Sequence, residues 1–392
     1  MKKHVARKAR AGLLFCGLNL GASVALANNG AELSANGPTA AGMGGVSIAI
    51  PQGTTTAVDN PAGMSEVGNQ IDFFAVAVAA AANSTFVSPE NHQFSRFVSV
   101  APQMGFNYQV APKWTFGVSV TGAGLASKYG EAPLPVPGAS IAKASLLIIN
   151  AAPTVTYKPL PNLSVGASLV LAVMQFRASG LIAPGPTGPI AIPSRGNSYA
   201  TGIGAGFGVL WTPVPMVSVG ASYYTKTRFT PLSHYKDDIL APSGGHLDMP
   251  SKYGVGIAIR PLHGLTLGVD YLRILWSGAA GVNMPASFNW HDQNVVRLGV
   301  AYDINEKWTV RAGYSFANSF IDSDHTLANY YANGITDRSV TAGATYNIDK
   351  KNSVTFAVEY DIPRTVIGTG PSTGTNISAN SQWYSIGYTH KF

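Results

Sequence analysis

Residues 307–317 read Lys-Trp-Thr-Val-Arg-Ala-Gly-Tyr-Ser-Phe-Ala and alternate between two kinds of side chain. Every second position from Trp308 to Phe316 is apolar, whereas the positions between them, Thr309 to Ser315, are polar or glycine. Successive side chains of a β-strand point to opposite faces, so this period of two indicates a strand with one apolar face and one polar or small face.

The same alternation returns along the chain, most clearly in 264–271, 297–303 and 353–361. Short segments rich in Pro, Asn and Asp separate the alternating runs as tight turns, at 111–113, 159–162, 212–215, 261–264, 305–307 and 349–352. Longer segments lie between these turns, at 81–95, 126–142, 178–197, 230–246, 278–289, 318–336 and 366–378. Six turns and seven loops predict fourteen strands, at 71–80, 96–109, 113–125, 143–158, 162–177, 198–211, 216–229, 247–260, 264–276, 290–304, 307–317, 337–348, 352–364 and 379–392.

The first 27 residues have the organisation of a secretory signal peptide. Five basic residues between Lys2 and Arg10 precede an apolar stretch over 11–20, and Ala25-Leu26-Ala27 forms a small-x-small cleavage site. The alternative is a lipoprotein signal that ends at Cys16, but Phe15 stands where that signal needs a small residue. We therefore expect an exported chain whose mature form starts at Asn28.

Loss of the signal changes the charge of the chain. The full sequence has 26 Lys and Arg against 19 Asp and Glu, and five of the basic residues precede residue 28, which leaves 21 and a net charge of +2. The basic character of the full chain therefore does not indicate a nucleic-acid partner, and we expect none. The single cysteine is lost as well, which excludes a disulfide framework and thiol chemistry.

No stretch after residue 27 approaches the ~20 apolar residues of a membrane-spanning helix. In lipid, only helices and closed barrels satisfy every backbone polar group. The sequence therefore predicts an all-β fold, a 14-stranded antiparallel transmembrane β-barrel over residues 71–392 in the outer membrane of a Gram-negative bacterium. Fourteen strands enclose more space than the roughly eight whose side chains alone fill a barrel. We expect a monomer.

Residues 35–64 do not follow the strand pattern. They carry few charges and many small residues, with no sustained period of 3.6 or 2. The stretch is too apolar for a disordered tail and too rich in glycine for a good helix. We expect residues 28–70 to fold inside the barrel as a hatch that plugs the lumen.

The second half of this stretch contains a turn signal. Asp59 or Asn60 can accept a hydrogen bond from its own backbone, and Pro61 fixes φ. Ala62 and Gly63 are small enough to let the backbone lie against a wall. An ordinary turn of this type on the protein surface is the alternative.

The final strand ends in an aromatic residue, Phe392, with Tyr388 on the same face. An aromatic, alternating C-terminal strand of this kind resembles the signal that the outer-membrane assembly machinery recognises. An edge strand with a chance terminal phenylalanine is the alternative.

Several of these motifs together resemble the opening and the strands of the FadL/TodX family of outer-membrane transporters for hydrophobic compounds. The opening combines a glycine-rich run, Gly42, Gly44 and Gly45, with Asn60-Pro61-Ala62-Gly63 before the first strand. Weaker matches are Asp248-Met249-Pro250, Asp270-Tyr271, and the strands at 297–302 and 309–314. The resemblance covers the mature chain and implies a hatch, long-chain fatty acids or aromatic hydrocarbons as substrates, and an inward kink of the third strand that opens the wall sideways.

The third predicted strand contains Gly122 and Gly124. Glycine inside a strand suggests a bulge, a bend or a close backbone approach. The residues are therefore candidates for the kink. The alternative is a strand that frays into the loop at 126–142.

Several side chains that we expect to point into the barrel are apolar, whereas the lumen of a water-filled porin is polar. These candidates for lining a hydrophobic ligand site are Leu146, Ile148, Val170, Ala172, Met174 and Phe176. They can equally pack against the hatch. The loops at 132–142 and 181–193 are also apolar, which predicts either a capture groove at the cell surface or a lid.

A fatty carboxylate would favour a cation, and Arg177 and His291 at the outer strand ends are the candidates. Arg177 breaks the inward alternation, so contact with lipopolysaccharide phosphates at the rim is the other interpretation. Neither residue is needed for an uncharged hydrocarbon.

The sequence favours no catalytic or cofactor site. Gly370-Pro371-Ser372-Thr373-Gly374 matches G-x-S-x-G, but it lies in a loop between strands rather than at a strand-turn-helix elbow. The histidines show no metal-binding spacing. We therefore expect passive uptake of hydrophobic molecules, with release through a shift of residues 28–36, and no cofactor, metal or enzyme activity. A general diffusion porin and a barrel hydrolase are the rival functions.

Overall fold

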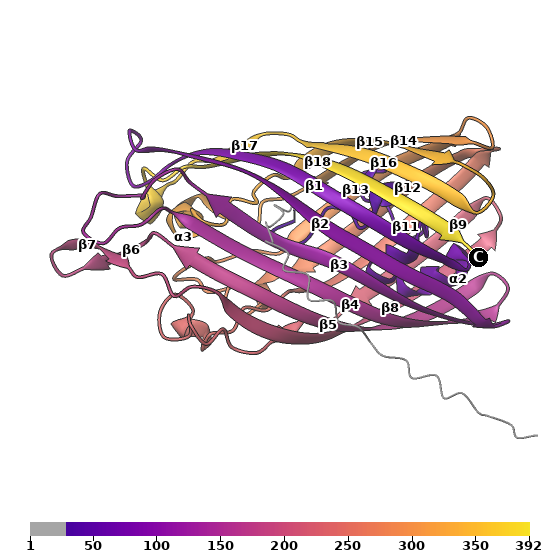
Figure 1. The fold of residues 1–392 in the computed structure, drawn as a ribbon, viewed down its shortest axis with the longest axis horizontal. Coiled ribbons are helices and arrows are strands. Elements are labelled where there is room, and N and C mark those ends of the chain that lie inside the picture. The colour runs from indigo at the N-terminus through magenta and orange to yellow at the C-terminus, as the bar shows by residue number, and fades with distance from the viewer. Residues whose placement is uncertain (1–28) are drawn as a thin grey trace, which may run out of the picture.

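Fourteen strands of the computed structural model form one closed antiparallel barrel, which Figure 1 shows lengthwise. The structure describes residues 29–392, so the predicted signal peptide and its cleavage site lie outside the described residues. The barrel strands are β1 (Gln70–Thr85), β2 (His92–Ala111), β3 (Trp114–Lys128), β4 (Lys143–Leu160), β5 (Leu163–Ser179), β8 (Ser198–Val214), β9 (Val217–Tyr224), β11 (Ser251–Leu262), β12 (Leu265–Leu275), β13 (Gln293–Asp303), β14 (Trp308–Ala317), β15 (Arg338–Asn347), β16 (Asn352–Asp361) and β18 (Ile377–Lys391).

The barrel closes between its first and last strands, which pair from Gln70 opposite Lys391 to Ala81 opposite Asn380. The large apolar residues of the alternating pattern are exposed on the outer wall, for example Trp308, Val310 and Phe316. Their partners in the alternation point inward. The prediction of a fourteen-stranded barrel is therefore confirmed.

The strand boundaries differ from the prediction at the end with the long loops. The first loop is shorter than 81–95, because the alanine-rich end of β1 continues to Thr85 and gives no alternation that would reveal a strand. The predicted strand at 216–229 is interrupted: β9 ends at Tyr224, and β10 (Arg228–Phe229) pairs back to β8.

Two further pieces of sheet lie in the long loops. The predicted loop at 178–197 contains a separate hairpin of β6 (Leu181–Gly185) and β7 (Gly188–Ile192), which projects beyond the barrel wall in Figure 1. A short strand, β17 (Arg364–Val366), pairs with the start of β18.

The helices of the described residues are all short, and none is long and apolar enough to cross a membrane. Four precede the barrel: α1 (Pro38–Ala41), η1 (Thr54–Val58), η2 (Pro61–Gly63) and α2 (Met64–Val67). The others lie in the loops or at a strand end: η3 (Ala241–Ser243), η4 (Trp276–Gly278), η5 (Ser323–His325), α3 (Thr326–Asn329) and η6 (Gly370–Ser372).

Residues 29–69, the N-terminal segment, are largely buried against the inner faces of the strands. Because the segment has little regular structure, its backbone groups need partners from the wall. The carboxylate of Asp270 accepts from the N–H groups of Ser47 and Ile48 at 2.7 and 3.0 Å. Arg297 donates to the carbonyl of Gly45 at 3.0 Å.

Glycines on both sides allow this close contact. Gly44 and Gly45 have φ of 67° and 87°, a region that favours glycine, and they lie directly against the barrel strands or their side chains. On the wall, a Cβ at Gly208 would lie 2.0 Å from Oδ1 of Asn60. Gly202, Gly204, Gly206 and Gly208 form an inward-facing row on β8, and Asn60 occupies part of the space that they leave.

Asn60 joins three parts of the structure. Its side-chain amide donates to the carbonyls of Ile48 at 2.7 Å and Val209 at 3.0 Å, and its Oδ1 accepts from the N–H of Ala62 at 3.1 Å. The residue is fully buried. It is therefore Asn60, rather than Asp59, whose side chain bonds to its own backbone turn.

We expect Asn60→Ala to lower the free energy of unfolding by about 2 to 4 kcal/mol, because it leaves buried backbone groups without partners. The segment, which contains no Lys or Arg, should also become sensitive to proteinase K in folded protein. Asn162→Ala, in an exposed turn, should change neither quantity. Equal unfolding curves for the two variants would contradict this role of Asn60.

Candidate functional site

A cavity of about 990 Å³ lies at the long-loop end of the barrel and is lined almost entirely by apolar side chains. The wall contributes Leu125, Leu146 and Phe176, and the hairpin of β6 and β7 covers one side. Most of the remaining lining comes from the loops at 239–247, 282–290 and 324–332, with Phe86, Leu134 and Pro371 at its edges. Its size and lining suit an apolar small molecule or a folded acyl chain.

The predicted lining residues divide into three groups in the structure. Leu146 and Phe176 line the cavity itself. Ile148, Ala172 and Met174 are buried in the hydrophobic core that adjoins it. Val170 lines a separate, smaller cavity of about 80 Å³ near the third strand. All six therefore face the inside of the barrel, but only two reach the large cavity.

The two apolar loops do not contribute equally to this cavity. Residues along both strands of the β6–β7 hairpin, such as Leu181 and Ile192, line it, whereas the loop at 132–142 contributes Leu134. Ile141 and Ile190 remain exposed. The hairpin thus combines a cavity-lining face with an exposed apolar edge.

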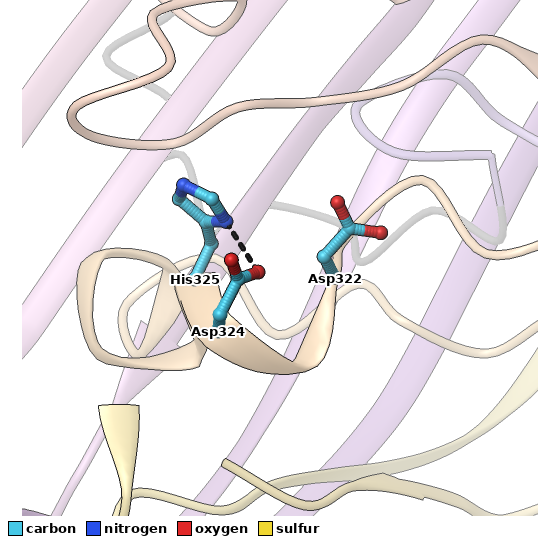
Figure 2. A group of neighbouring side chains, drawn as sticks. All are labelled: Asp322, Asp324 and His325. Atoms are coloured by element: carbon cyan, nitrogen blue, oxygen red, sulfur yellow. Dashed lines mark hydrogen bonds and ion pairs between the residues drawn. The ribbon is translucent and has the colours of Figure 1, made fainter. Parts of the chain in front are cut away.

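Asp324 and His325 are the charged side chains of the lining, which contains no Lys or Arg among the described residues. Figure 2 shows both residues with Asp322 on the turn that leads into α3. His325 Nδ1 lies 2.7 Å from Oδ1 of Asp324, and Nε2 lies 2.8 Å from the carbonyl of Pro285. Both ring nitrogens face acceptors, so both are best satisfied as N–H donors of an imidazolium.

This arrangement affects the protonation of His325. Burial lowers the pKa of the imidazole, but the carbonyl of Pro285 and the carboxylate of Asp324 outweigh it, and the pKa is raised above the ordinary value of 6.5. At the cavity, Asp324 offsets the charge of His325. The lining therefore offers no further cation for a carboxylate ligand among the described residues.

Potential metal-ligand atoms of Asp322, Asp324 and His325 lie within 4.8 Å of one another. A metal ion needs a lone pair from the imidazole. Both nitrogens of His325 face hydrogen-bond acceptors, and Asp322 forms an ion pair with His291. The geometry therefore fits a hydrogen-bonded cluster better than a metal centre.

The two predicted carboxylate partners are not in the cavity lining. Arg177 is exposed on the outer face because it follows the inward-facing Phe176 in the alternation of β5. His291 is exposed as well and pairs with Asp322. Neither is positioned to meet a ligand head group inside the cavity.

The G-x-S-x-G motif forms the turn η6 between β17 and β18. The hydroxyl of Ser372 donates to the backbone carbonyl of Asp324 at 2.7 Å and accepts from the N–H of Leu327 at 3.0 Å. Ser372 thus ties this turn to α3, and the nitrogens of His325 are directed elsewhere.

The N-terminal segment reaches an aromatic cluster in the hydrophobic core beside the cavity. Trp276 and Trp290 pack edge to face with ring centroids 4.7 Å apart, and Trp290 also lines the cavity. A Cβ at Gly30 would lie 2.6 Å from the ring of Trp276. The next residue, Ala31, accepts a 2.9 Å hydrogen bond from the N–H of Gly124. The segment therefore connects the cluster to the third strand.

The hydrogen-bonded ladder between β2 and β3 is interrupted beside Gly122 and Gly124 of β3. The two strands pair up to Met104 opposite Val120 and meet again only at an isolated bridge between Ser95 and Tyr129. Continued pairing would place Pro102 opposite Gly122, and proline cannot donate to a ladder. β3 remains fully paired with β4, so its ladder is broken only on the side of β2.

The small cavity lies beside β3 at this break, and an ion pair forms part of its lining. Gly122, Thr121 and Val170 line it, together with Glu32 and Lys252. Lys252 Nζ lies 2.8 Å from Oε2 of Glu32, and both side chains are mostly buried. The pair holds residue 32 of the N-terminal segment against β11.

The sequence signals for these features are uneven. Pro102 lies in a long strand, where proline is unusual, and could have marked the break. The roles of Trp290, Asp324 and His325 come from loops whose packing has no periodic signal. The pairing of Glu32 with Lys252 spans 220 residues and leaves no local trace.

A family model described as "Outer membrane protein transport protein (OMPP1/FadL/TodX)" matches residues 19–391. No curated protein sequence matches the chain.

Solved structures of similar fold include the toluene transporter TodX of Pseudomonas putida, with 19% identity, a TM-score of 0.72 and coverage of 93% of this chain and 100% of that one. The toluene transporter TbuX of Ralstonia pickettii has 20% identity and a TM-score of 0.67, with coverage of 92% and 99%. A Pseudomonas aeruginosa FadL homologue has 15% identity and a TM-score of 0.69, with coverage of 93% and 100%. At these identities the likeness concerns the fold.

We expect the pKa of His325 in the folded protein to lie above 6.5. NMR of labelled imidazole carbons, with the protein in micelles, measures this pKa. A histidine whose pKa is higher in the folded state than in the unfolded state stabilises the fold. This stabilisation is complete at a pH below the unfolded-state pKa, and it is lost as the pH rises through the folded-state pKa. Cleavage of the segment 318–337 by added protease should therefore increase as the pH rises from 6.5 through the raised pKa of His325. Cleavage of an unstructured peptide at each pH corrects for the pH dependence of the protease itself.

His325→Gln should remove this pH dependence, whereas His291→Gln, which alters the neighbouring ion pair with Asp322, should retain it. A midpoint below 6.5 for His325, or the same profile in the His325 variant, would contradict the assignment.

Proposed function

Because this chain belongs to the OMPP1/FadL/TodX family of outer-membrane transport proteins, we propose that it takes up uncharged hydrophobic molecules passively across the outer membrane of a Gram-negative bacterium. The observation that carries this proposal is the apolar cavity of about 990 Å³, lined by no Lys or Arg of the described chain and bordered by Asp324. Toluene is the compound named for two proteins of similar fold.

The charge of the lining separates two substrate classes. A buried carboxylate requires a cation or several donors. His325 is the one cation at the cavity, and Asp324 already neutralises it. An uncharged hydrocarbon is therefore favoured over a fatty acid, although the cavity has room for either.

Entry would take place between the long loops. The hairpin of β6 and β7 offers apolar residues on the outside, such as Ile190, and on the cavity side, such as Ile192. A ligand that moves along this hairpin exchanges one apolar contact for another. Transfer from the cell surface then needs no step through water.

Release would require movement of the N-terminal segment. Each buried methylene contributes about 0.8 kcal/mol to binding, so a static apolar cavity retains its ligand. Residues 30–32 lie between the aromatic cluster and the small cavity, and they are held by the Ala31–Gly124 hydrogen bond and the Glu32–Lys252 ion pair. Their displacement would join the two cavities.

Exit would follow the break between β2 and β3 into the lipid. The small cavity lies against this break at Gly122, where a Cβ would be 3.6 Å from the Cβ of Ala101 in β2. The absence of a side chain here leaves the route open. A ligand that leaves laterally would also enter the lipid without passing through the aqueous periplasm.

Gly122→Leu should reduce uptake to the level of cells that lack the protein, because its side chain extends across the break. The added Cβ itself meets only ordinary contacts, and pairing with β4 is unaffected, so the barrel should still assemble. Val173→Phe adds similar bulk to an exposed position of the outer wall and should leave uptake unchanged. Uptake of radiolabelled toluene by whole cells measures both, and normal uptake by the Gly122 variant would exclude this exit.

The preference for uncharged ligands predicts that hexadecan-1-ol binds at least about tenfold more tightly than hexadecanoate at neutral pH. Quenching of tryptophan fluorescence measures both affinities, since Trp290 lines the cavity. Asp324→Asn should reduce the difference between the two affinities, whereas Asp303→Asn, at the opposite end of the barrel, should leave this difference unchanged. Tighter binding of hexadecanoate would show that fatty acids are the better ligands.

A further inference from the structure

Four basic residues lie side by side on the outer face of the barrel, near the long-loop end. They are Arg96 on β2, Lys128 on β3, Lys143 on β4 and Arg177 on β5, and we call them the basic row. Lys128 and Lys143 are direct cross-strand partners. The bridge between Ser95 and Tyr129, continued by one residue, places Arg96 opposite Lys128.

Arg177 completes the row from the next strand. It is the cross-strand partner of Ser145, which is two residues from Lys143 on the same face of β4. Side chains two residues apart on one strand share a face. The row therefore crosses four neighbouring strands.

The strand alternation places the whole row outside the barrel. Ser127, Ala144 and Ala178, which are next to three of the basic residues in sequence, face inward and contact the loops or line the cavity. Arg96, Lys128 and Arg177 are exposed, and Lys143 is partly exposed.

The charges of the row have no partners within the described chain. None of the four side chains forms an ion pair or a side-chain hydrogen bond with another described residue. Glu131, three residues after the end of β3, accepts a hydrogen bond from the side-chain amide of Gln93 at 3.4 Å. Like charges that face each other across strands destabilise a sheet, so the fold alone does not explain this row.

The row lies near the long-loop end of the apolar outer wall. On the same strands and the same outer face, the positions nearer the centre of the barrel are exposed and apolar: Val98, Ile149 and Val173. Tyr199, also exposed, stands on the next strand. Apolar residues followed by Lys and Arg mark the boundary between hydrocarbon and lipid head groups.

We propose that the basic row binds the phosphate groups of a lipid in the outer leaflet. Arg and Lys hold phosphate through charge-assisted hydrogen bonds, and one diphosphorylated head group can contact residues from several strands. The bound anion would offset the repulsion between Lys128 and Lys143. It would also join β2 to β3 at the end of the break in their ladder, through Arg96 and Lys128.

The test uses the mature protein in a zwitterionic detergent, titrated with diphosphorylated lipid A and followed by native mass spectrometry. The double variant Lys128→Gln/Lys143→Gln should bind at least about tenfold more weakly than the wild type. The matched control Lys350→Gln/Lys351→Gln removes two exposed lysines at the opposite end of the barrel and should bind like the wild type. Lipid A without phosphates should bind weakly to the wild type. Its affinity should be no higher than the affinity of the double variant for the diphosphorylated lipid.

Unchanged affinity of the double variant, or equal binding of the lipid without phosphates, would overturn the proposal. Displacement of the lipid by millimolar inorganic phosphate would overturn it in favour of a site for free phosphate. Heat-modifiable migration of each variant reports whether the barrel is folded. If the double variant does not fold, Arg177→Gln takes its place against the charge-conserving Arg177→Lys, and equal affinity of these two would reject the proposal.

Discussion

The width of a fourteen-stranded ring is the constraint on which the rest of this structure depends. Roughly eight strands are filled by their own side chains, so a wider closed barrel needs other material inside it. Here the N-terminal segment occupies the lumen, and the long loops enclose the cavity at one end. The inward-facing glycines of β8 and the close contacts at Gly44 follow from this filling, because backbone must lie directly against backbone.

The filling divides the interior into functional parts. The polar anchors, Asp270, Arg297 and Asn60, hold the middle of the segment. The start of the segment is held by fewer contacts, chiefly the Ala31–Gly124 hydrogen bond and the Glu32–Lys252 ion pair. These contacts lie between the large cavity and the break in the wall. In the proposed release, a displacement of this end of the segment would join the two cavities while its middle stays in place.

The barrel could be predicted from the sequence because contact with lipid favours alternation along most of its strands, and each tight turn carries Pro, Asn or Asp. The inward direction of residues such as Leu146 and Met174 follows from the same parity. The cavity could not be predicted in this way. Two polar residues of its lining, Asp324 and His325, lie in a loop whose sequence has no periodic pattern. Arg177 is outside the cavity because its side chain points to the outer face of β5. Pro102 gave a local signal for the break, which Gly122 and Gly124 alone left ambiguous.

The bonds of the N-terminal segment also order the events of folding. Ser34 donates to Glu359 at 2.7 Å and the N–H of Gly44 to Thr341 at 2.9 Å, so residues near the start of the chain depend on strands close to its end. Contacts of such sequence separation form only after the intervening chain is ordered. The segment that precedes the barrel strands in sequence can thus complete these bonds only after the last strands are in place. The lumen consequently stays without its filling until β15 and β16 have joined the sheet.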